Sequence, residues 1–263
     1  MLPDLRMIPD SSLSKRLRAI LLLAAGLACF LTEAQAQTPS NRVKDPNQHA
    51  WLMYFGAHRL SPKIGLHTEA QLRRARVLSD PQQLLLRAGL NYYPAENAML
   101  TLGYAYVDTY PYGDFPAAAI FPEHRLYQQL QLGGSTGLFR FTHRYRLEQR
   151  WVHFPNTDAA TYLHRARYFF RAVLPLQGAT LDDKEFYLAA YDEIFVGFGK
   201  NMAQNFFDQN RLFGAIGYRF TPRAQIELGY LNQIVQQRNG RVFEHNHTLQ
   251  AALYYNLDFS RRD

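Results

Sequence analysis

Cysteine is almost absent from this chain of 263 residues, which contains only one. That residue, Cys29, lies inside an apolar run at 19–31 near the N-terminus. A lipoprotein signal would make Cys29 the first mature residue, but "GLAC" departs from a lipobox and the run continues through Phe30 and Leu31. The rest of the chain therefore has neither disulfides nor a thiolate metal site to stabilise it.

Long apolar runs are absent as well. The N-terminal run is shorter than the roughly 20 residues that a spanning helix needs, and no later segment reaches about 18 consecutive apolar residues. Basic residues at 15, 16 and 18 precede the run, and an Ala-x-Ala site at 34–36 follows it. This order predicts a signal peptide at 1–36 that is removed on export. About 227 residues then remain, enough for one substantial domain.

The composition is unusual for a soluble secreted protein. Aromatic residues make up 14% of the chain, with 17 Tyr and 18 Phe, yet the mean hydropathy is −0.32. This combination indicates that apolar and polar residues alternate along the chain instead of forming separate blocks.

The stretch "FRFTHRYRLEQRW" at 139–151 shows the alternation most clearly. Phe139, Phe141, Tyr145 and Leu147 share one parity, and arginines and a glutamate occupy the other. Successive side chains of an extended strand point to opposite faces, so this segment predicts a strand with one apolar and one charged face. The same period of two returns in ten further segments: 50–57, 63–74, 84–92, 99–106, 125–132, 162–174, 185–196, 210–220, 224–233 and 248–259.

The polar faces carry too many Arg, Glu and Gln residues for the dry core of a soluble sandwich, where an unpaired charge is costly. Segments of about ten residues suit tilted strands that cross a bilayer, and aromatic residues near their ends suit girdles at its two interfaces. With lipid against the apolar faces, only a closed barrel pairs every backbone group. We therefore predict an all-β, closed, antiparallel, up-and-down transmembrane β-barrel at 48–259, with a short segment at 37–47 before it and a tail at 260–263.

The strand count leaves a choice. Single-chain bacterial barrels usually have an even number of strands, whereas eleven segments alternate here. We expect twelve strands, with ten as the second choice. A further strand would lie at 42–48 or within 107–124, or else two early segments would form one strand.

The connections also alternate in length. Short turns at 94–97, 133–137 and 221–224 contrast with longer connections at 107–124, 151–161, 197–206 and 236–246. Outer-membrane barrels combine short periplasmic turns with longer outer loops. The last segment ends in Phe259, and an aromatic residue near the end of the last strand is typical of bacterial barrel-assembly substrates. We expect the protein in the outer membrane of a Gram-negative bacterium, in contact with lipid and lipopolysaccharide.

Several short motifs resemble a known family. "RARYFFR" (165–171), "YDEIF" (191–195), "FDQNR" (207–211), "GYRF" (217–220) and "ELGYLNQ" (227–233) are similar to segments of an outer-membrane family labelled domain of unknown function 2490. The resemblance spans roughly 48–259, although its motifs cluster after residue 160. It implies an outer-membrane β-barrel and brings no activity, ligand or catalytic residue with it.

A set of polar side chains is predicted to face the barrel interior. The candidates are Arg140, Arg144, Arg146, Arg150, Arg165, Arg167, Arg171, Glu193, Arg211, Tyr191 and Tyr127, with Arg87, Arg219, Glu69, Glu148, Glu185 and Glu227 as further members. In one hypothesis Arg and Glu pair across the lumen and fill it, which gives a structural or plugged barrel. In the other the excess of arginine lines a narrow channel for anions or acidic oligosaccharides.

A third hypothesis is a membrane-embedded lipid hydrolase or acyltransferase, and the sequence argues against it. The serines after the cleavage site fall in tails, loops or turns: Ser40, Ser61, Ser79, Ser135 and Ser260. None is placed on a strand beside a histidine, as a Ser–His pair requires. We expect no enzyme, no catalytic residue, no metal and no cofactor. Nucleic acid is not expected as a partner either, because the positive charge would surround a lumen.

Two local features complete the analysis. Asp192 has the outward parity, so either a β-bulge shifts the register or the residue lies near an interface. Its neighbour Glu193 points inward, and we expect an interior pair between Glu193 and Arg211. His245 and His247 project to one side of a strand, but their place beside a loop favours rim histidines over a metal site.

Overall fold

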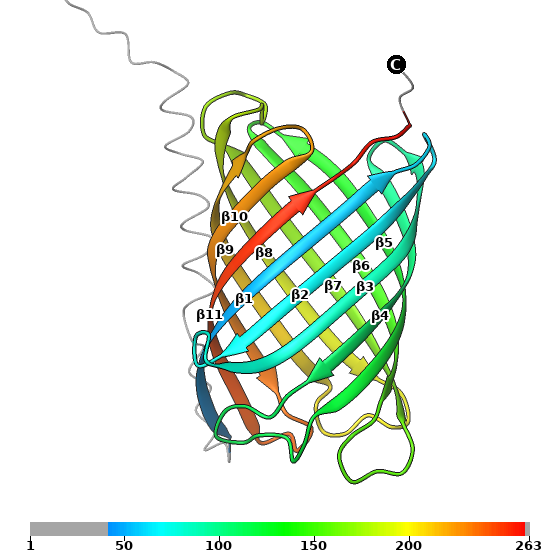
Figure 1. Ribbon diagram of the computed structural model, residues 1–263, viewed down its shortest axis with the longest axis vertical. Coiled ribbons are helices and arrows are strands. Elements are labelled where there is room, and N and C mark those ends of the chain that lie inside the picture. The colour runs from blue at the N-terminus through cyan, green and yellow to red at the C-terminus, as the bar shows by residue number, and fades with distance from the viewer. Residues whose placement is uncertain (1–41, 261–263) are drawn as a thin grey trace, which may run out of the picture. The chain divides into compact units, whose positions relative to one another are not determined.

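The computed structural model of the protein describes residues 42–260, and the predicted signal peptide lies outside them. These residues form eleven strands, and they contain no helix that is long and apolar enough to cross a membrane (Figure 1). The strands are β1 (Val43–Arg59), β2 (Ile64–Ala75), β3 (Asp80–Ala95), β4 (Ala98–Thr109), β5 (Phe121–Thr136), β6 (Phe139–Val152), β7 (Thr161–Pro175), β8 (Glu185–Phe198), β9 (Phe207–Arg219), β10 (Ala224–Gln236) and β11 (Val242–Tyr255).

The eleven strands close into a barrel. Each strand pairs antiparallel with its neighbours in sequence, whereas β1 and β11 pair in parallel, from Val43 opposite Val242 to Phe55 opposite Tyr254. Strand direction alternates along the chain, so the first and the eleventh strand run the same way and can meet only in parallel. The predicted all-β closed barrel is confirmed. It differs from our expectation in its closure, because a parallel seam replaces the twelfth strand that an all-antiparallel barrel would need.

The two places proposed for an extra strand have other roles. Residues 43–48 are the first part of β1, so the barrel begins before the boundary that we predicted at residue 48. Within 107–124, β4 continues to Thr109 and β5 begins at Phe121, which leaves a loop at 110–120. The last strand begins and ends earlier than predicted, because β11 runs from Val242 to Tyr255 in place of 248–259.

The odd strand number places the start of β1 and the end of β11 at opposite ends of the barrel. The connections 60–63, 96–97, 137–138, 176–184 and 220–223 lie at the end where β11 stops, which we call the turn end. The connections 76–79, 110–120, 153–160, 199–206 and 237–241 lie at the opposite end, where β1 begins, which we call the loop end (lower end in Figure 1). The predicted long connections at 107–124, 151–161 and 197–206 are confirmed at the loop end, whereas 237–241 is shorter than the predicted 236–246. Connection 76–79 at that end is also short, and 176–184 at the turn end is long.

Side chains alternate between the two faces of the wall as predicted. Along β6, Tyr145 and Leu147 are 47% and 49% exposed, while Arg146 and Glu148 are 2% and 1% exposed. Apolar residues on the other strands are exposed in the same way, with Leu90 at 62%. The barrel therefore has an apolar outer surface and a polar interior, the inverse of a soluble domain.

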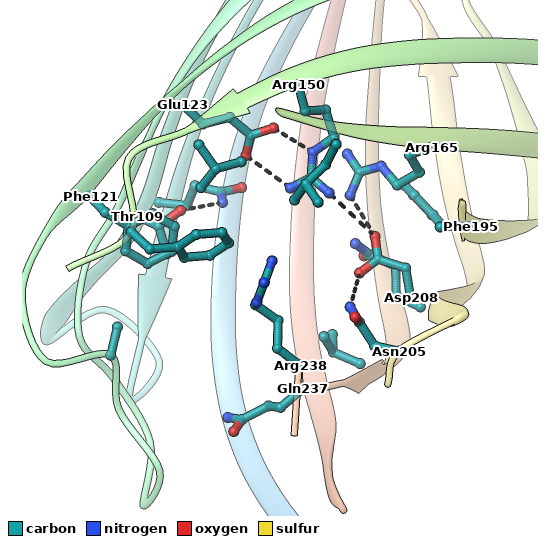
Figure 2. A pocket seen from close by; sticks show the side chains of 18 of the residues that line it. Thr109, Phe121, Glu123, Arg150, Arg165, Phe195, Asn205, Asp208, Gln237 and Arg238 are labelled. Atoms are coloured by element: carbon teal, nitrogen blue, oxygen red, sulfur yellow. Dashed lines mark hydrogen bonds and ion pairs between the residues drawn. The ribbon is translucent and has the colours of Figure 1, made fainter. Parts of the chain in front are cut away.

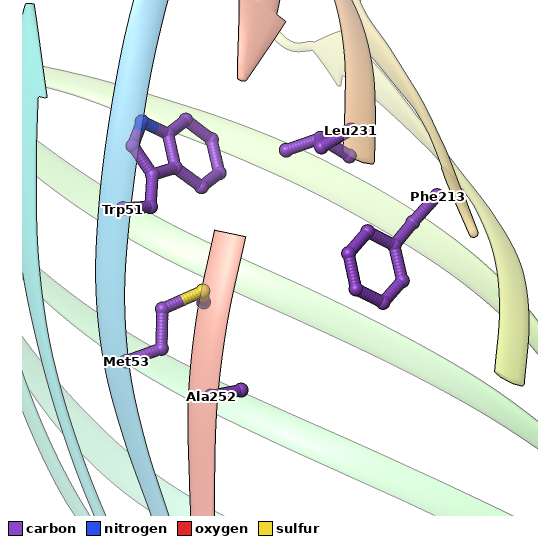
Figure 3. Close-up of a cluster of buried hydrophobic side chains, with 5 residues drawn as sticks. All are labelled: Trp51, Met53, Phe213, Leu231 and Ala252. Carbon is purple, nitrogen blue, oxygen red and sulfur yellow. The ribbon is translucent and has the colours of Figure 1, made fainter. Parts of the chain in front are cut away.

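One part of the interior is apolar, however. Trp51, Met53, Phe213, Leu231 and Ala252 form a buried cluster on β1, β9, β10 and β11, beside the seam (Figure 3). The indole N–H of Trp51 donates to the side chain of Gln82 (2.8 Å). Burying each large side chain of this cluster contributes about 1.5–3 kcal/mol. We call these five residues the seam cluster.

Two glycines make room for interior tyrosines. Gly103 lies opposite Tyr127, and Gly217 lies opposite Tyr187. A Cβ atom at either glycine would come within 2.4 Å or less of the tyrosine ring, so each ring lies flat over the backbone of the next strand. Both tyrosines are almost fully buried. An aromatic ring over a strand glycine restores the packing that the glycine lacks.

Candidate functional site in the barrel interior

All eleven predicted interior residues lie on the inward parity of their strands. Arg146, Arg165, Arg167, Arg211, Glu193 and Tyr127 are buried, and Arg144, Arg150, Arg171 and Tyr191 are partly buried. Arg140 lies near the turn end, and no ion pair joins it to another described residue. Ser135, which we placed in a turn, lies near the end of β5 opposite Arg140.

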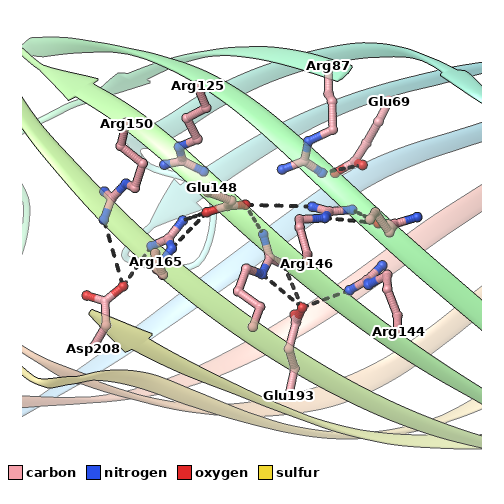
Figure 4. A network of polar contacts seen from close by, with 12 residues as sticks. Glu69, Arg87, Arg125, Arg144, Arg146, Glu148, Arg150, Arg165, Glu193 and Asp208 are labelled. Atoms are coloured by element: carbon pink, nitrogen blue, oxygen red, sulfur yellow. Dashed lines mark hydrogen bonds and ion pairs between the residues drawn. The ribbon is translucent and has the colours of Figure 1, made fainter. Parts of the chain in front are cut away.

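Glu148 is the centre of the interior network. Its carboxylate accepts hydrogen bonds from Arg165 (2.6 and 2.8 Å) and from Arg167 (2.7 Å), and Arg146 lies 3.8 Å away (Figure 4). Because Glu148 is 1% exposed, these arginines replace the water that would otherwise solvate its charge.

Glu193 extends the network across β7. It accepts hydrogen bonds from Arg144 on β6 (2.8 Å) and from Arg167 on β7 (2.6 Å). The predicted pair with Arg211 is present, but its N–O distance is 3.8 Å. Arg211 is therefore the weakest of the three partners, and sequence reasoning identified the pair without the two stronger contacts.

Aromatic faces complete the packing around these charges. The guanidinium carbons of Arg167 and Arg211 lie 4.3 and 4.7 Å from the ring centroid of Phe195, and Arg73 lies 4.0 Å above Trp51. Such cation–π contacts join the charged side chains to the seam cluster. A side chain that bordered a water-filled channel would be exposed to that water. At mid-height the interior side chains are instead buried, as Trp51 and Phe195 are at 1% each.

Toward the turn end, Glu227 links opposite parts of the wall. Its carboxylate pairs with Arg171 of β7 and accepts hydrogen bonds from Tyr187 of β8 (2.9 Å) and Tyr254 of β11 (3.0 Å). Side chains from β7, β8 and β11 thus meet at a single carboxylate of β10 inside the barrel.

Toward the loop end, two carboxylates share the arginines. Glu123 accepts hydrogen bonds from Arg125 and Arg150, both at 2.5 Å. Asp208 accepts one from Arg165 (2.7 Å) and lies 4.0 Å from Arg150. Neither Glu123 nor Asp208 was among the predicted residues. Glu123 lies two residues from the start of β5, where the alternation is too short to reveal the inward parity. Asp208 lies at the register shift between β8 and β9, so its inward contact departs from the alternation that places Gln209 and Arg211 inside.

Between this group and the loops of the loop end lies a cavity of about 680 Å³, which we call the vestibule (Figure 2). Its lining includes Glu123, Arg150, Arg165 and Asp208 from the strands and Arg238 from the loop at 237–241. Parts of the loops 110–120, 153–160 and 199–206 complete its wall. Arg167 and Arg211 of the buried network also line the cavity, so the vestibule reaches from the loops of the loop end down to that network.

The loop at 110–120 is fastened to the wall at the mouth of the barrel. The hydroxyl of Tyr112 donates to Glu244 of β11 (2.8 Å), and the amide of Gln237 donates to the same carboxylate (3.1 Å) and to the carbonyl of Phe115 (3.2 Å). Burial and the negative charge of Glu244 raise the pKa of Tyr112 well above its usual value. Tyr112 therefore stays a neutral donor at ordinary pH.

The exterior carries polar contacts of its own. Asp192 faces outward, and the pairing of β8 with β9 is regular from Glu185 to Phe195, so no bulge shifts the register there. The side-chain amide of Asn210 donates to both carboxylate oxygens of Asp192 (3.2 and 2.9 Å).

The outward histidines show no metal site. His247 contacts the hydroxyl of Tyr230 at 2.5 Å through its Nδ1 atom. No group of three His, Asp or Glu residues within 42–260 is arranged to hold a metal ion.

The protein therefore belongs to the class of closed β-barrels that have an apolar outer surface and a charged, hydrogen-bonded interior. The model of a family described as "Protein of unknown function (DUF2490)" matches residues 48–244. The chain belongs to this family, and the predicted resemblance is confirmed. No curated protein and no solved structure matches the chain.

Proposed function

We propose that the protein is an outer-membrane β-barrel whose interior is closed by its Arg, Glu and Tyr network, so that it does not conduct solutes. The buried state of Glu148, held by Arg165 and Arg167 at mid-height, is the observation that carries this proposal. Charges that fill a lumen and pair with one another give a rigid, closed barrel.

The outer surface supports the membrane location. Exposed leucines such as Leu90 and Leu147 lie along the wall together with a few tyrosines such as Tyr145, and further aromatic contacts lie at both ends. At the loop end Trp151 contacts Tyr162 (5.0 Å between ring centroids), and at the turn end Tyr218 contacts Phe186 (4.7 Å) and Phe220 (4.8 Å). Two aromatic belts that flank an apolar band are typical of barrels in a bilayer.

The alternative is a narrow channel that selects anions or acidic oligosaccharides. The excess of interior arginine favours it, because arginines in a pore attract anions. The packing at mid-height opposes it, because Arg167 and Arg211 lie against Phe195 instead of bordering an open path. We therefore rank the closed barrel first. We propose no lipid hydrolase or acyltransferase activity, and sustained turnover of labelled phospholipid by the pure protein would refute that.

Two measurements test the closed barrel. Membrane fractions of a Gram-negative host that expresses the full chain are expected to contain it with the outer membrane, in a form whose gel mobility changes on heating. The purified protein in planar bilayers is expected to give no steady conductance. An anion-selective conductance would replace the proposal with the channel, and recovery in the soluble periplasmic fraction would refute both.

A further inference from the structure

The vestibule has features that a closed barrel does not require. A plugged lumen needs paired charges, and the network at mid-height provides them. Arg238, by contrast, comes from a loop, extends into the cavity toward Arg150 (Figure 2), and no carboxylate among the described residues pairs with it. Its guanidinium carbon lies 4.2 Å from the ring centroid of Phe154, which holds the side chain in this position.

The charges of the vestibule do not balance. Arg125 and Arg150 share the single carboxylate Glu123, and Arg150 is also the more distant partner of Asp208. Arg73 on the opposite wall donates only to the amide oxygens of Gln71 and Gln83. Burial, together with the positive charge on Arg150, lowers the pKa of Arg238. The guanidinium groups thus repel one another across the cavity, and an anion between them would remove that repulsion.

The other lining residues are suited to a sugar. The rings of Phe121 and Phe154 contact each other at 5.6 Å on one side of the cavity, and side-chain amides from Asn205, Gln236 and Gln237 line it elsewhere. Aromatic faces can stack on the apolar face of a sugar ring, and amides can donate to and accept from hydroxyl groups. A volume of about 680 Å³ lies within the range of about 300–1,000 Å³ that is usual for ligand pockets.

We propose that the vestibule binds an acidic saccharide, a short sugar chain that carries carboxylate or phosphate groups, with its anionic group between Arg238 and Arg150. Arginine engages both groups through paired hydrogen bonds, which gives direction as well as charge. This proposal adds a ligand to the closed barrel proposed above, and it rests on that proposal because the buried network forms the floor of the binding site. The saccharide enters from the loop end and leaves by the same way.

The test is calorimetric titration of the purified full chain in a nonionic detergent. The probes are a uronic-acid trisaccharide, the neutral trisaccharide with the same linkage, a phosphorylated core oligosaccharide released from lipopolysaccharide, and inorganic phosphate. We expect at least one acidic saccharide to bind at least tenfold more tightly than the neutral one, with an affinity that falls as salt is raised. Preference for the core oligosaccharide would assign the ligand to the cell's own surface, and preference for the uronate would assign it to the medium.

Matched variants locate the site. Arg238→Gln is expected to weaken binding of the preferred acidic saccharide at least tenfold. Arg223→Gln, the same change in an exposed turn at the opposite end of the barrel, is expected to leave it unchanged. Both residues lie outside the strands, so neither change removes an interior ion pair of the barrel.

Three outcomes would overturn the inference: equal affinity for the neutral trisaccharide, binding of phosphate without either saccharide, or full affinity in Arg238→Gln. Conductance of the same preparations separates this inference from the closed barrel. Binding together with an anion current would leave the saccharide site in place and refute the closed floor. Absence of conductance together with absence of saccharide binding would refute the saccharide site and leave the closed barrel in place.

Discussion

The two parts of the barrel interior fill the same lumen by different means. Around the seam, the cluster of Trp51, Met53, Phe213, Leu231 and Ala252 fills space with apolar side chains. On β5 to β8, arginines and glutamates fill it with charges that must meet partners at defined distances. Apolar contacts tolerate a change of shape, whereas a buried charge tolerates no loss of its partner. The charged wall therefore fixes the interior more strictly than the apolar wall does.

Removal of the central carboxylate is expected to have one of the largest effects. Glu148→Gln leaves Arg165 and Arg167 buried with one carboxylate fewer, and the free energy of unfolding is expected to fall by about 3–5 kcal/mol. Urea unfolding in lipid vesicles, followed by tryptophan fluorescence, measures this. Glu96→Gln, in an exposed turn, is the control and is expected to change nothing. A loss of less than about 1 kcal/mol in Glu148→Gln would mean that water reaches the network.

Substitutions of Glu193 and Arg211 compare a carboxylate that has three arginine partners with the weakest of those partners. Glu193→Gln weakens contacts with three arginines, so we expect a loss close to that of Glu148→Gln. Of the arginine partners of Glu193, Arg211→Gln removes only the one at 3.8 Å and leaves Arg144 and Arg167 bound. We expect it to cost about 1 kcal/mol, as for a weak pair. The order of the two losses in the same urea experiment is the readout, and an inverted order would contradict the distances.

The apolar wall is expected to respond less to a change of shape. Phe213→Leu keeps the side chain apolar and of similar volume, so the loss of unfolding free energy is expected to stay below about 1.5 kcal/mol. Phe213→Ala, which leaves a cavity, is expected to cost about 3–5 kcal/mol. Both are measured by urea unfolding in vesicles. If leucine proved as harmful as alanine, the seam cluster would depend on ring contacts, such as that of Phe213 with Tyr191 at 4.7 Å, more than on volume.

The smallest effect is expected at the mouth. The raised pKa of Tyr112 means that its hydrogen bond to Glu244 is fully present below the ordinary tyrosine pKa of about 10 and is lost as pH rises through the higher value in the folded protein. Protease cleavage of the loop at 110–120 is thus expected to stay slow from neutral pH to about pH 10 and to rise above it. Tyr112→Phe is expected to be cleaved faster at neutral pH and to lack the alkaline step. The same alkaline step in the variant would assign it to another group.

Alternation in the sequence was sufficient to predict the barrel wall and its inward side chains. Arg146 and Glu148 follow from their parity alone, and so does the outward position of Asp192. The seam cluster also left a signal in the sequence. The segment "AWLMYFGA" is apolar on both parities, whereas a strand with lipid on one face and water on the other would be apolar on only one. The parallel seam left a signal in the count of eleven alternating segments, but the usual even number of strands in bacterial barrels led us to expect a twelfth. The vestibule, by contrast, was hidden, because Arg238 and Tyr112 lie in loops, where no period marks which way a side chain points.

The parallel seam has a practical consequence. Because β1 and β11 point the same way, an epitope placed just before Val43 and another placed just after Tyr255 would face different compartments of a cell that carries the barrel in its envelope. Antibody applied to intact cells would label only one of them, and a protease outside would spare the other. A pair of terminal fusions would then report from one protein which end of the barrel faces outward. A barrel with an even number of strands does not allow this, because both chain termini lie at the same end.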